Sequence, residues 1–325
     1  MAKVIRIHET GGTEVLASEE VTLAAPEPDQ ARVRQTAVGL NMIDTYHRSG
    51  LYPLPGLPHG LGLEAAGVVE QIGAEVDGVK VGDRVAYAAG PPGAYASERN
   101  VPAAKLVAVP EGVSDIEAAA VLLKGMTVEY LVRRTFPVAP GMTVLLHAAA
   151  GGVGLLACQW LAHLGATVIG TVGSDEKAEL ARAHGCHHPI VYTRDDFVGR
   201  VQELTDGAGV PVVYDSVGQA TFQGSIDCLA RRGMLVAFGN ASGAPEPFDP
   251  LLLSQKGSLF LTRPTLFDYV VTRDELLASS QEVFDRVASG ALKITINQQL
   301  PLSEIAAAHE AIEGRATSGA TVLIP

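Results

Sequence analysis

The 325-residue sequence predicts an α/β protein with a doubly wound parallel sheet and a separate β-rich domain. From Thr143 onward, short apolar runs alternate with helical patterns, which is the order of a parallel sheet covered by helices. A glycine turn at Gly151–Gly154 joins the first run to the first helical pattern. Residues 1 to about 120 hold short alternating runs between Gly and Pro turns, which indicates a β-rich region.

The β-rich region contains four predicted strands, a rigid Pro-rich loop and two helices that lead into the second region. The strands are Lys3–His8, Ala31–Val38, Gly67–Ile72 and Asp83–Ala88, the loop is Tyr52–Pro58, and the helices are Asp115–Leu123 and Thr127–Arg134. The parallel region has predicted strands at Thr143–Ala148, Thr167–Val172, Pro189–Tyr192, Val210–Ser216 and Gly233–Phe238.

The tail contains a strand at Ser258–Thr262, a helix at Asp274–Ala288, a strand at Ile294–Gln299, a helix at Ser303–Glu313 and a strand at Ala320–Ile324. The elements after Thr262 cannot all extend one compact core, so we expect them to return and complete the first domain. The predicted domains are residues 1–124 with 264–325, and residues 125–263.

Composition excludes several classes of protein. A hydrophobic content of 47% indicates a globular chain, and a net charge of −12 disfavours binding to nucleic acid or anionic membranes. The three cysteines are isolated, which suits a reducing compartment. The sequence has no signal-peptide pattern and no apolar run of membrane-spanning length. We therefore expect a soluble cytoplasmic protein that binds neither nucleic acid nor membrane.

The run Thr143–Gly154 predicts a strand, a glycine turn and a helix, which is the order that a dinucleotide site needs. Backbone N–H groups at the helix start can hold a pyrophosphate, and the helix dipole favours its charge. The first glycine of the usual G-x-G-x-x-G is Ala149 here, so the prediction depends on the strand–turn–helix context. The alternative is an ordinary turn between a strand and a helix.

The next strand indicates which dinucleotide is bound. In an NAD site, an acidic residue at the end of this strand binds the ribose 2′-hydroxyl, but here the strand ends at Val172. Ser174 and Lys177 follow at the start of a helix and can hold a 2′-phosphate, which predicts NADPH. Alternatively, Lys177 is a solvated helix lysine, and the neighbouring Asp175 and Glu176 weaken the prediction.

Several segments together resemble the zinc-independent quinone oxidoreductases, relatives of zeta-crystallin in the medium-chain dehydrogenase/reductase superfamily. The segments are Val38–Gly50, Gly62–Val69, Val81–Val85, Ala148–Gly154, Tyr214–Gly218, Ala237–Asn240, Leu261–Pro264 and Gly314–Thr317. The resemblance spans essentially the whole chain. It implies a Rossmann domain that binds NADPH and a β-rich GroES-like catalytic domain.

The sequence departs from the zinc-dependent alcohol dehydrogenases of the same superfamily at their metal ligands. Their first cysteine ligand aligns with Asn41, their histidine with Leu63, and their second cysteine falls near Leu123. Amide and aliphatic side chains cannot replace thiolate and imidazole at a tetrahedral zinc. The cysteines of the structural-zinc lobe are also missing between Val85 and Asn100. We expect no metal site.

The resemblance implies hydride transfer from NADPH to a quinone. It places Asn41, Tyr46, Tyr52 and Thr127 around the nicotinamide and the acceptor, with Tyr46, Asn41 and Tyr52 as the catalytic residues. Tyr46 is the expected hydrogen-bond donor to the quinone oxygen, because its ordinary pKa of about 10 favours donation over full proton transfer. The alternative is that Tyr46 is a packing residue of an amphipathic helix.

The resemblance also implies a set of cofactor-binding residues. Lys177 and Tyr192 are expected to hold the 2′-phosphate, and Phe238 to pack near the nicotinamide. For Arg315, a structural salt bridge is an equally good interpretation. The set is Asn41, Tyr46, Thr127, Tyr130, Gly152, Val153, Gly173, Ser174, Lys177, Tyr192, Ser216, Val217, Phe238, Gly239, Arg263 and Arg315.

Three acidic residues are expected to have structural roles: salt bridges for Glu64 and Asp44, and hydrogen bonds for Asp215. Two other functions stay open. One is NADPH-dependent reduction of the activated double bond of an enone or alkenal, and the other is a non-catalytic, crystallin-like NADPH-binding protein. The resemblance further implies a homodimer, formed through an edge strand at Ser258–Thr262.

We predict that metal analysis of the purified protein will find no stoichiometric zinc, because Asn41, Leu63 and the region of Leu123 lack metal-binding side chains. The measurement is elemental analysis after gel filtration, with a zinc-dependent alcohol dehydrogenase as the positive control. One tightly bound zinc per chain would contradict the prediction.

Overall fold

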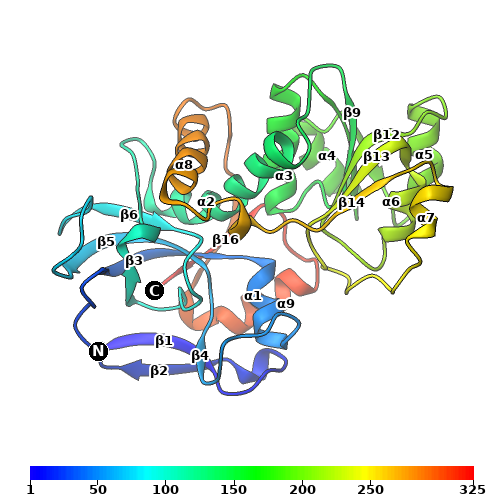
Figure 1. Cartoon of the computed structure of the whole chain (residues 1–325). Coiled ribbons are helices and arrows are strands. Elements are labelled where there is room, and N and C mark those ends of the chain that lie inside the picture. The colour runs from blue at the N-terminus through cyan, green and yellow to red at the C-terminus, as the bar shows by residue number, and fades with distance from the viewer. The chain divides into compact units, whose positions relative to one another are not determined.

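The computed structural model describes all 325 residues and divides into two compact units. The first unit contains Met1–Met126, Val270–Gly290 and Ile294–Pro325, and the second contains Thr127–Tyr269 with Ala291–Lys293. Both ends of the chain belong to the first unit (Figure 1).

The second unit is built on a six-stranded sheet in which every neighbouring pair is parallel. The order is β11-β10-β9-β12-β13-β14, so successive strands run outward from β9 on one side and from β12 on the other. The carboxyl ends of β9 and β12 therefore form the switch point, where such sheets bind ligands. The strands are β9 Thr143–Leu146, β10 Thr167–Val172, β11 His188–Val191, β12 Val210–Asp215, β13 Leu229–Ala237 and β14 Phe260–Thr262.

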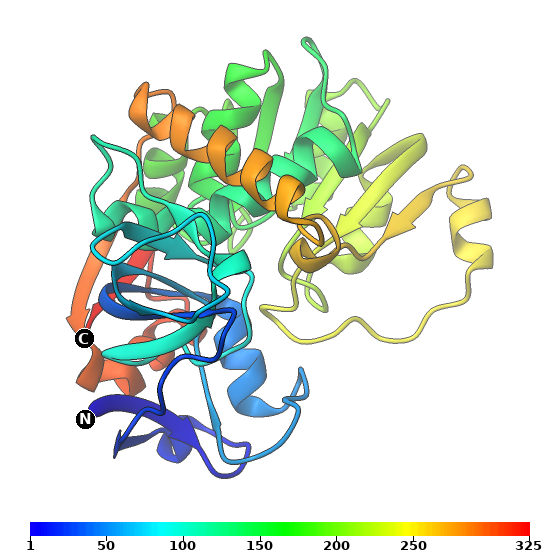
Figure 2. The ribbon, with the colours of Figure 1, turned by 60° about the vertical axis from the view of Figure 1, so that its left-hand side comes forward.

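Helices cover both faces of this sheet, with α3 and α4 packed together on one face and α5 and α6 on the other (Figure 1). After β13 the chain runs through a long irregular stretch before the short helix α7, which is the yellow segment in Figure 2. The helices are α3 Gly152–His163, α4 Asp175–Ala183, α5 Phe197–Leu204, α6 Phe222–Asp227 and α7 Leu251–Gln255.

The first unit contains a three-stranded sheet, β2-β1-β4, and a larger sheet in the order β15-β16-β3-β5-β6-β8, with β7 also paired to β3. The C-terminal strand β16 pairs antiparallel with β3, which puts Leu323 opposite Val38. The strands are β1 Ala2–Ile7, β2 Ala17–Val21, β3 Gln30–Leu40, β4 His59–Gly60, β5 Glu64–Ile72, β6 Arg84–Tyr87, β7 Glu98–Pro102, β8 Val107–Ala108, β15 Ile296–Pro301 and β16 Ala320–Ile324.

Four longer helices belong wholly or partly to the first unit: α1 Met42–Ser49, α2 Asp115–Tyr130, α8 Arg273–Ala288 and α9 Ile305–Glu313. The structure also contains a π-helical turn and four short 3-10 helices. These are η3 Leu131–Thr135 and η1 Thr13–Val15, η2 Ala103–Lys105, η4 Leu266–Asp268 and η5 Leu302–Glu304.

The sequence interpretation was wrong about the helices before the parallel sheet, because α2 is one continuous helix where a break near Gly125 was expected. A Cβ built on Gly125 would lie 2.6 Å from Cγ1 of Val283 in α8. The glycine therefore allows close helix packing and does not end the helix. Strands β2 and β7 were not predicted, since both carry charged residues at half-exposed positions and depend on pairing with β1 and β3.

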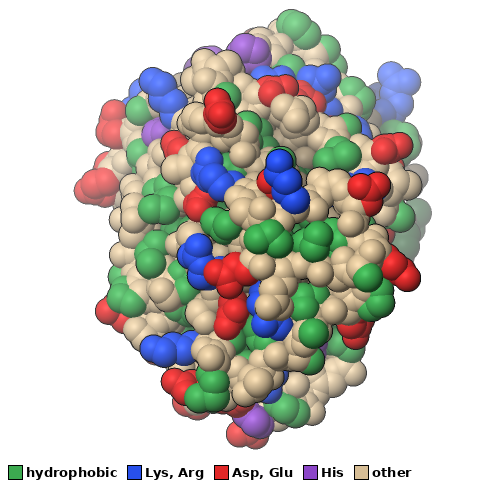
Figure 3. Space-filling view, turned by 90° about the vertical axis from the view of Figure 1, so that its left-hand side faces the viewer, with side chains coloured by type: hydrophobic (Ala, Val, Ile, Leu, Met, Phe, Trp, Pro, Cys, Tyr) green, Lys and Arg blue, Asp and Glu red, His purple; other side chains and the backbone are tan.

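No helix of the structure is both long and apolar enough to cross a bilayer. On the face drawn in Figure 3, acidic and basic side chains are interspersed and do not form a continuous basic surface.

Candidate cofactor and acceptor sites

The glycine turn of the second unit leads into α3 and forms a candidate anion site. Gly151 is the N-cap residue, with extended backbone angles, and no side chain caps the helix. The N–H groups of the first turn, including those of Gly152 and Val153, are therefore oriented for a bound anion. A Cβ on Gly154 would overlap the carbonyl oxygen of Ala148, so glycine is required for the helix to start this close to the turn.

Four of the predicted cofactor residues lie beyond the carboxyl ends of β10 and β11: Gly173, Ser174 and Lys177 follow β10, and Tyr192 follows β11. Ser174 caps α4 by accepting a 3.3 Å hydrogen bond from the backbone N–H of Lys177. A Cβ built on Gly173 would lie 3.4 Å from the hydroxyl oxygen of Tyr192, which is 41% exposed. Strand β10 itself ends at Val172, so no carboxylate stands where an NAD site has one.

One further basic residue, Arg194, lies near the start of α4 and was not predicted as a site residue. Its guanidinium pairs with Asp175 at 3.1 Å, and both side chains are exposed. The pair partly neutralises an acidic residue in the first turn of α4. A single arginine in a loop gives no sequence signal, since its partner is set by how β11 leads into that loop.

The buried carboxylate of Asp215 organises the loop after β12. It accepts hydrogen bonds from the backbone N–H groups of Val217 at 2.8 Å and Gly218 at 3.1 Å. The hydroxyl of Ser225 also donates to it at 2.8 Å, and His147 lies 3.0 Å from that hydroxyl. Burial lowers the pKa of His147, which favours the neutral ring. The expected structural role of Asp215 is confirmed.

Five predicted cofactor residues cluster at the carboxyl ends of β12, β13 and β14. The N–H of Phe238 donates to the carbonyl of Asp215 at 2.7 Å, and Gly239 lies so close to Ser216 that a Cβ would overlap its carbonyl oxygen. Arg263 donates to the carbonyl of Ala237 at 3.0 Å. The cluster is Ser216, Val217, Phe238, Gly239 and Arg263.

Three other predicted cofactor residues have different surroundings. Tyr130 is buried and stacks on Tyr269 with ring centroids 4.3 Å apart. Thr127 lies on α2 and is 8% exposed, whereas Arg315 follows α9 with a positive φ of 57°.

Helix α1 positions the three predicted catalytic residues of the first unit. Asn41 is its N-cap, Tyr46 lies in its second turn, and Tyr52 follows its C-terminal end. The rings of Tyr46 and Tyr52 pack edge to face with centroids 5.1 Å apart, and the N–H of Tyr52 donates to the carbonyl of Tyr46 at 3.0 Å. The backbone N–H of Asn41 donates to Asp44 at 2.9 Å, which anchors the first turn.

Asn41 is also linked to a fully buried ion pair. Glu64 accepts hydrogen bonds from Nδ2 of Asn41 at 2.8 Å, from the N–H of Leu123 at 2.6 Å and from Nζ of Lys124 at 3.2 Å. The expected salt bridge of Glu64 is therefore confirmed, with Lys124 as a partner that was not predicted. Two positions that align with zinc ligands, Asn41 and Leu123, both donate to this carboxylate.

The expected salt bridge of Asp44 is wrong, because the carboxyl makes hydrogen bonds and no ion pair. Tyr95 donates to its Oδ2 at 2.9 Å, while its Oδ1 is buried without a partner. Complete burial raises the pKa of Asp44 to about 7. The arginine of the same helix, Arg48, pairs with Glu313 instead.

A chain of donors leads from Arg48 to Asp44. A guanidinium can only donate hydrogen bonds, so Nη1 of Arg48 must be the donor to Nδ1 of His309, which lies 3.1 Å away. The proton of His309 is then on Nε2, 3.0 Å from the hydroxyl of Tyr95, which in turn donates to Asp44. Burial and the charge of Arg48 lower the pKa of His309 to about 3, so its ring is neutral.

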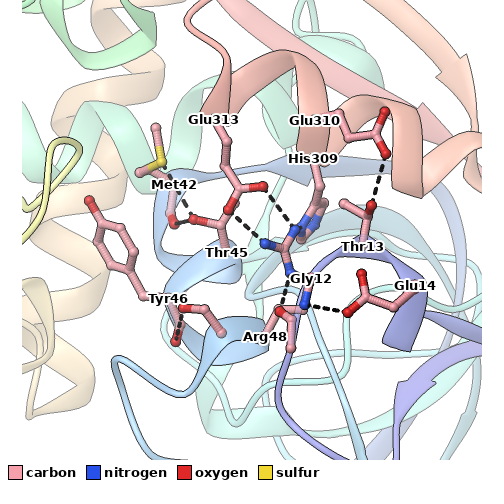
Figure 4. Close-up of polar contacts among 12 residues, drawn as sticks. Gly12, Thr13, Glu14, Met42, Thr45, Tyr46, Arg48, His309, Glu310 and Glu313 are labelled. Atoms are coloured by element: carbon pink, nitrogen blue, oxygen red, sulfur yellow. Dashed lines mark hydrogen bonds and ion pairs between the residues drawn. The ribbon is translucent and has the colours of Figure 1, made fainter.

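Arg48 fastens α1 to two distant parts of the first unit. It donates to Glu313 of α9 at 2.7 and 3.0 Å, and to the carbonyl of Gly11 at 3.1 Å. Figure 4 shows the Arg48 side chain directed toward α9, whereas Tyr46 points to the other side of α1. These contacts set the position of the helix that carries Tyr46.

Besides Arg194, sequence reasoning missed three buried residues near the candidate acceptor site, Lys124, Tyr95 and His309. Lys124 gave a usable signal, because it is a lone charge within an apolar helical run. His309 gave none, since its partners Tyr95 and Arg48 are more than 200 residues away.

We predict that Asp44→Asn changes how stability depends on pH. In the unfolded chain Asp44 ionises near its ordinary pKa of 3.8, but in the folded chain it does so only at about 7. The stability that this group contributes is complete below pH 3.8 and is lost as pH rises through 7. Asparagine does not ionise, so Asp44→Asn removes that loss. The free energy of unfolding of the variant, relative to that of the parent, should therefore rise by a few kcal/mol between about pH 4 and pH 8, since each unit of pKa shift is worth about 1.4 kcal/mol.

The measurement is the urea-unfolding free energy of both proteins across that pH range. The control is Asp77→Asn, which removes an exposed aspartate from a turn. The prediction is contradicted if the difference in unfolding free energy between Asp44→Asn and the parent does not change with pH.

Comparison with known proteins identifies the family of the chain. Residues 27–111 match the model of the alcohol dehydrogenase GroES-like domain, and residues 152–284 match the model described as zinc-binding dehydrogenase. The chain is 53% identical to a quinone oxidoreductase of Pseudomonas aeruginosa over the full length of both, and 48% identical to a 2-haloacrylate reductase of Burkholderia over 98% of both.

The solved structure of Escherichia coli quinone oxidoreductase complexed with NADPH has a TM-score of 0.98 to this chain. It is 49% identical and covers 99% of this chain and 100% of its own. Because this similarity extends over complete chains, the protein belongs to the quinone oxidoreductase family of the medium-chain dehydrogenase/reductase superfamily.

Proposed function

We propose that the protein is an NADPH:quinone oxidoreductase. One NADPH, one quinone and one proton give NADP⁺ and a hydroquinone. The observation that carries this proposal is the full-length similarity to quinone oxidoreductases, including one complexed with NADPH. The uncharged end of β10 supports the choice of NADPH, because a carboxylate there would repel a 2′-phosphate.

The residues of the second unit fit the cofactor. We propose that Gly152 and Val153 bind the pyrophosphate through their N–H groups, since α3 has no side-chain cap. Gly173, Ser174, Lys177 and Tyr192 would hold the 2′-phosphate. The remaining contacts would come from Thr127, Tyr130, Ser216, Val217, Phe238, Gly239 and Arg263, together with Arg315 of the first unit. When bound, NADPH supplies the hydride.

In the first unit, we propose that Tyr46 donates a hydrogen bond to the acceptor oxygen, with Asn41 and Tyr52 beside it. Tyr46 is held in place by α1 and by the ring of Tyr52. A quinone is already electrophilic and its reduced anion is delocalised, so orientation and one hydrogen bond can suffice. The side chains at Asn41, Leu63 and Leu123 support reduction without zinc.

Reduction of an activated carbon–carbon double bond is a second candidate, favoured by the 48% identity to a 2-haloacrylate reductase. Both reactions place a flat, conjugated acceptor against the nicotinamide. The deciding experiment follows NADPH and NADH oxidation with benzoquinone, a polycyclic quinone and 2-chloroacrylate, with and without a chelator. Chelator-resistant, NADPH-selective quinone reduction supports the first proposal. Faster turnover of chloroacrylate favours the second, and NADPH binding without turnover indicates a crystallin-like protein.

We further propose that the protein is a homodimer in the cytoplasm. Strand β14 is the edge of its sheet, and Phe260 on it is 56% exposed, so two copies could pair along Ser258–Thr262. The three cysteines are buried and unpaired, which suits a reducing compartment. Sedimentation equilibrium at micromolar concentration tests the dimer, and a monomeric mass would contradict it.

We predict that Lys177→Ala weakens NADPH binding roughly 10- to 100-fold, because a charged hydrogen bond to phosphate contributes about 1.5–3 kcal/mol. NADH binding should change by less than about twofold, since NADH lacks the 2′-phosphate. Fluorescence titration with both nucleotides measures this difference, with the exposed Lys80→Ala as the control. Equal losses for the two nucleotides would rule out the phosphate role.

We predict that Tyr46→Phe lowers kcat for quinone reduction by roughly 10- to 100-fold, as expected for loss of one hydrogen bond to a developing anion. The NADPH dissociation constant and the melting temperature should change little, because phenylalanine keeps the packing against Tyr52. Steady-state kinetics with saturating NADPH measures the effect. Unchanged kcat would remove Tyr46 from the mechanism.

A further inference from the structure

The Glu64–Lys124 ion pair lies in the core of the first unit. Glu64 is fully buried and Lys124 is 5% exposed, on a stretch of α2 that is otherwise apolar. Removing two charges from water is costly, and well-packed apolar side chains often give equal or greater stability. The pair is therefore poorly explained by stability alone.

The carboxylate has a specific task, which is to hold the Asn41 amide. Nδ2 of Asn41 and Nζ of Lys124 donate to the same oxygen, Oε2 of Glu64, at 2.8 and 3.2 Å. The N–H of Leu123 occupies the other oxygen. A Cβ on Gly39 would overlap Oε2, so the carboxylate is confined on that side as well. The nitrogen of the amide thus faces Glu64.

The negative charge of Glu64 would oppose formation of an anion near Asn41. Hydride transfer to a quinone leaves the acceptor as an anion until a proton arrives. A bare carboxylate one hydrogen bond away from Asn41 would repel that anion. At roughly 6 Å and an effective dielectric constant of about 20, the repulsion would lower anion affinity about 100-fold. The ammonium of Lys124 cancels this charge.

We propose that Lys124 is a positioning residue that balances the charge of Glu64, so that Glu64 can orient Asn41 without opposing formation of the acceptor anion. This inference rests on the proposed quinone reduction. Lys124 acts through Glu64 and need not touch the acceptor.

Three variants separate charge balance from packing. Lys124→Met leaves Glu64 as an unpaired negative charge, and Glu64→Gln leaves Lys124 as an unpaired positive one. The double variant Glu64→Gln/Lys124→Met has no net charge and keeps an amide oxygen to accept from Asn41. Circular-dichroism melting identifies any variant that does not fold, and NADPH titration checks the cofactor site.

The main readout is binding of dinitrophenolate, a flat anion that resembles the reduced acceptor, compared with uncharged dinitrobenzene. We expect Lys124→Met to lose phenolate affinity by roughly 10- to 100-fold. Glu64→Gln should bind phenolate at least as well as the parent, and the double variant should recover most of the loss. Dinitrobenzene affinity should change little in all three. Quinone kcat should follow the phenolate order for Lys124→Met and the double variant.

Asp44 must be considered in the same experiment, because Lys124 lowers its pKa and Glu64 raises it. Binding is therefore measured on both sides of its pKa of about 7, and the same order is expected at each pH.

The proposal is overturned if Glu64→Gln loses phenolate affinity as severely as Lys124→Met, because a packing role damages both. It is also overturned if the double variant recovers nothing. If Lys124→Met does not fold, the parent becomes the reference, and the proposal is overturned if Glu64→Gln or the double variant binds phenolate about 10-fold or more weakly than the parent. A parent that reduces no quinone would contradict the proposed function, whereas the order of phenolate affinities still tests the charge balance.

Discussion

The first unit depends on one buried carboxylate. Glu64 begins β5, yet its hydrogen bonds reach the end of the β3–α1 connection through Asn41 and the middle of α2 through Leu123 and Lys124. A charge with no access to water must be fully hydrogen-bonded and balanced, so these three elements have little freedom to move apart. The fold therefore holds Asn41 in place by the same interactions that make Glu64 tolerable.

A second set of buried polar contacts acts on the same helix from its other side. Asp44 and Arg48 are one turn apart on α1, and Tyr95 and His309 bridge them. Arg48 also reaches Glu313, so the C-terminal helix α9 supports the helix that carries Tyr46. In the second unit, Asp215 has the corresponding role, because it sets the loop that carries Ser216 and Val217. In each unit, a buried carboxylate thus holds the backbone that carries candidate site residues.

The sequence predicted correctly those features that depend only on residues close together in the chain. The strand–turn–helix at Thr143–Gly154 and the uncharged end at Val172 are properties of contiguous residues, and the structure contains both. The helix break predicted near Gly125 was wrong, because the glycine serves to let the distant residue Val283 pack closely against the helix. The salt bridge expected for Asp44 failed similarly, because Tyr95 supplies its hydrogen bond.

The sequence by itself determined the fold class, the glycine turn at Gly151–Gly154, the family and the candidate residues, because periodicity, glycine placement and contiguous motifs encode local geometry. Only the tertiary structure decided the partners of Glu64, Asp44 and Arg48. Apart from the N–H of Asn41, which bonds to Asp44 within one turn, those partners lie 23 to 265 residues away in the chain. Burial then decides which charges must be paired, and burial is a property of the assembled unit that no single segment contains.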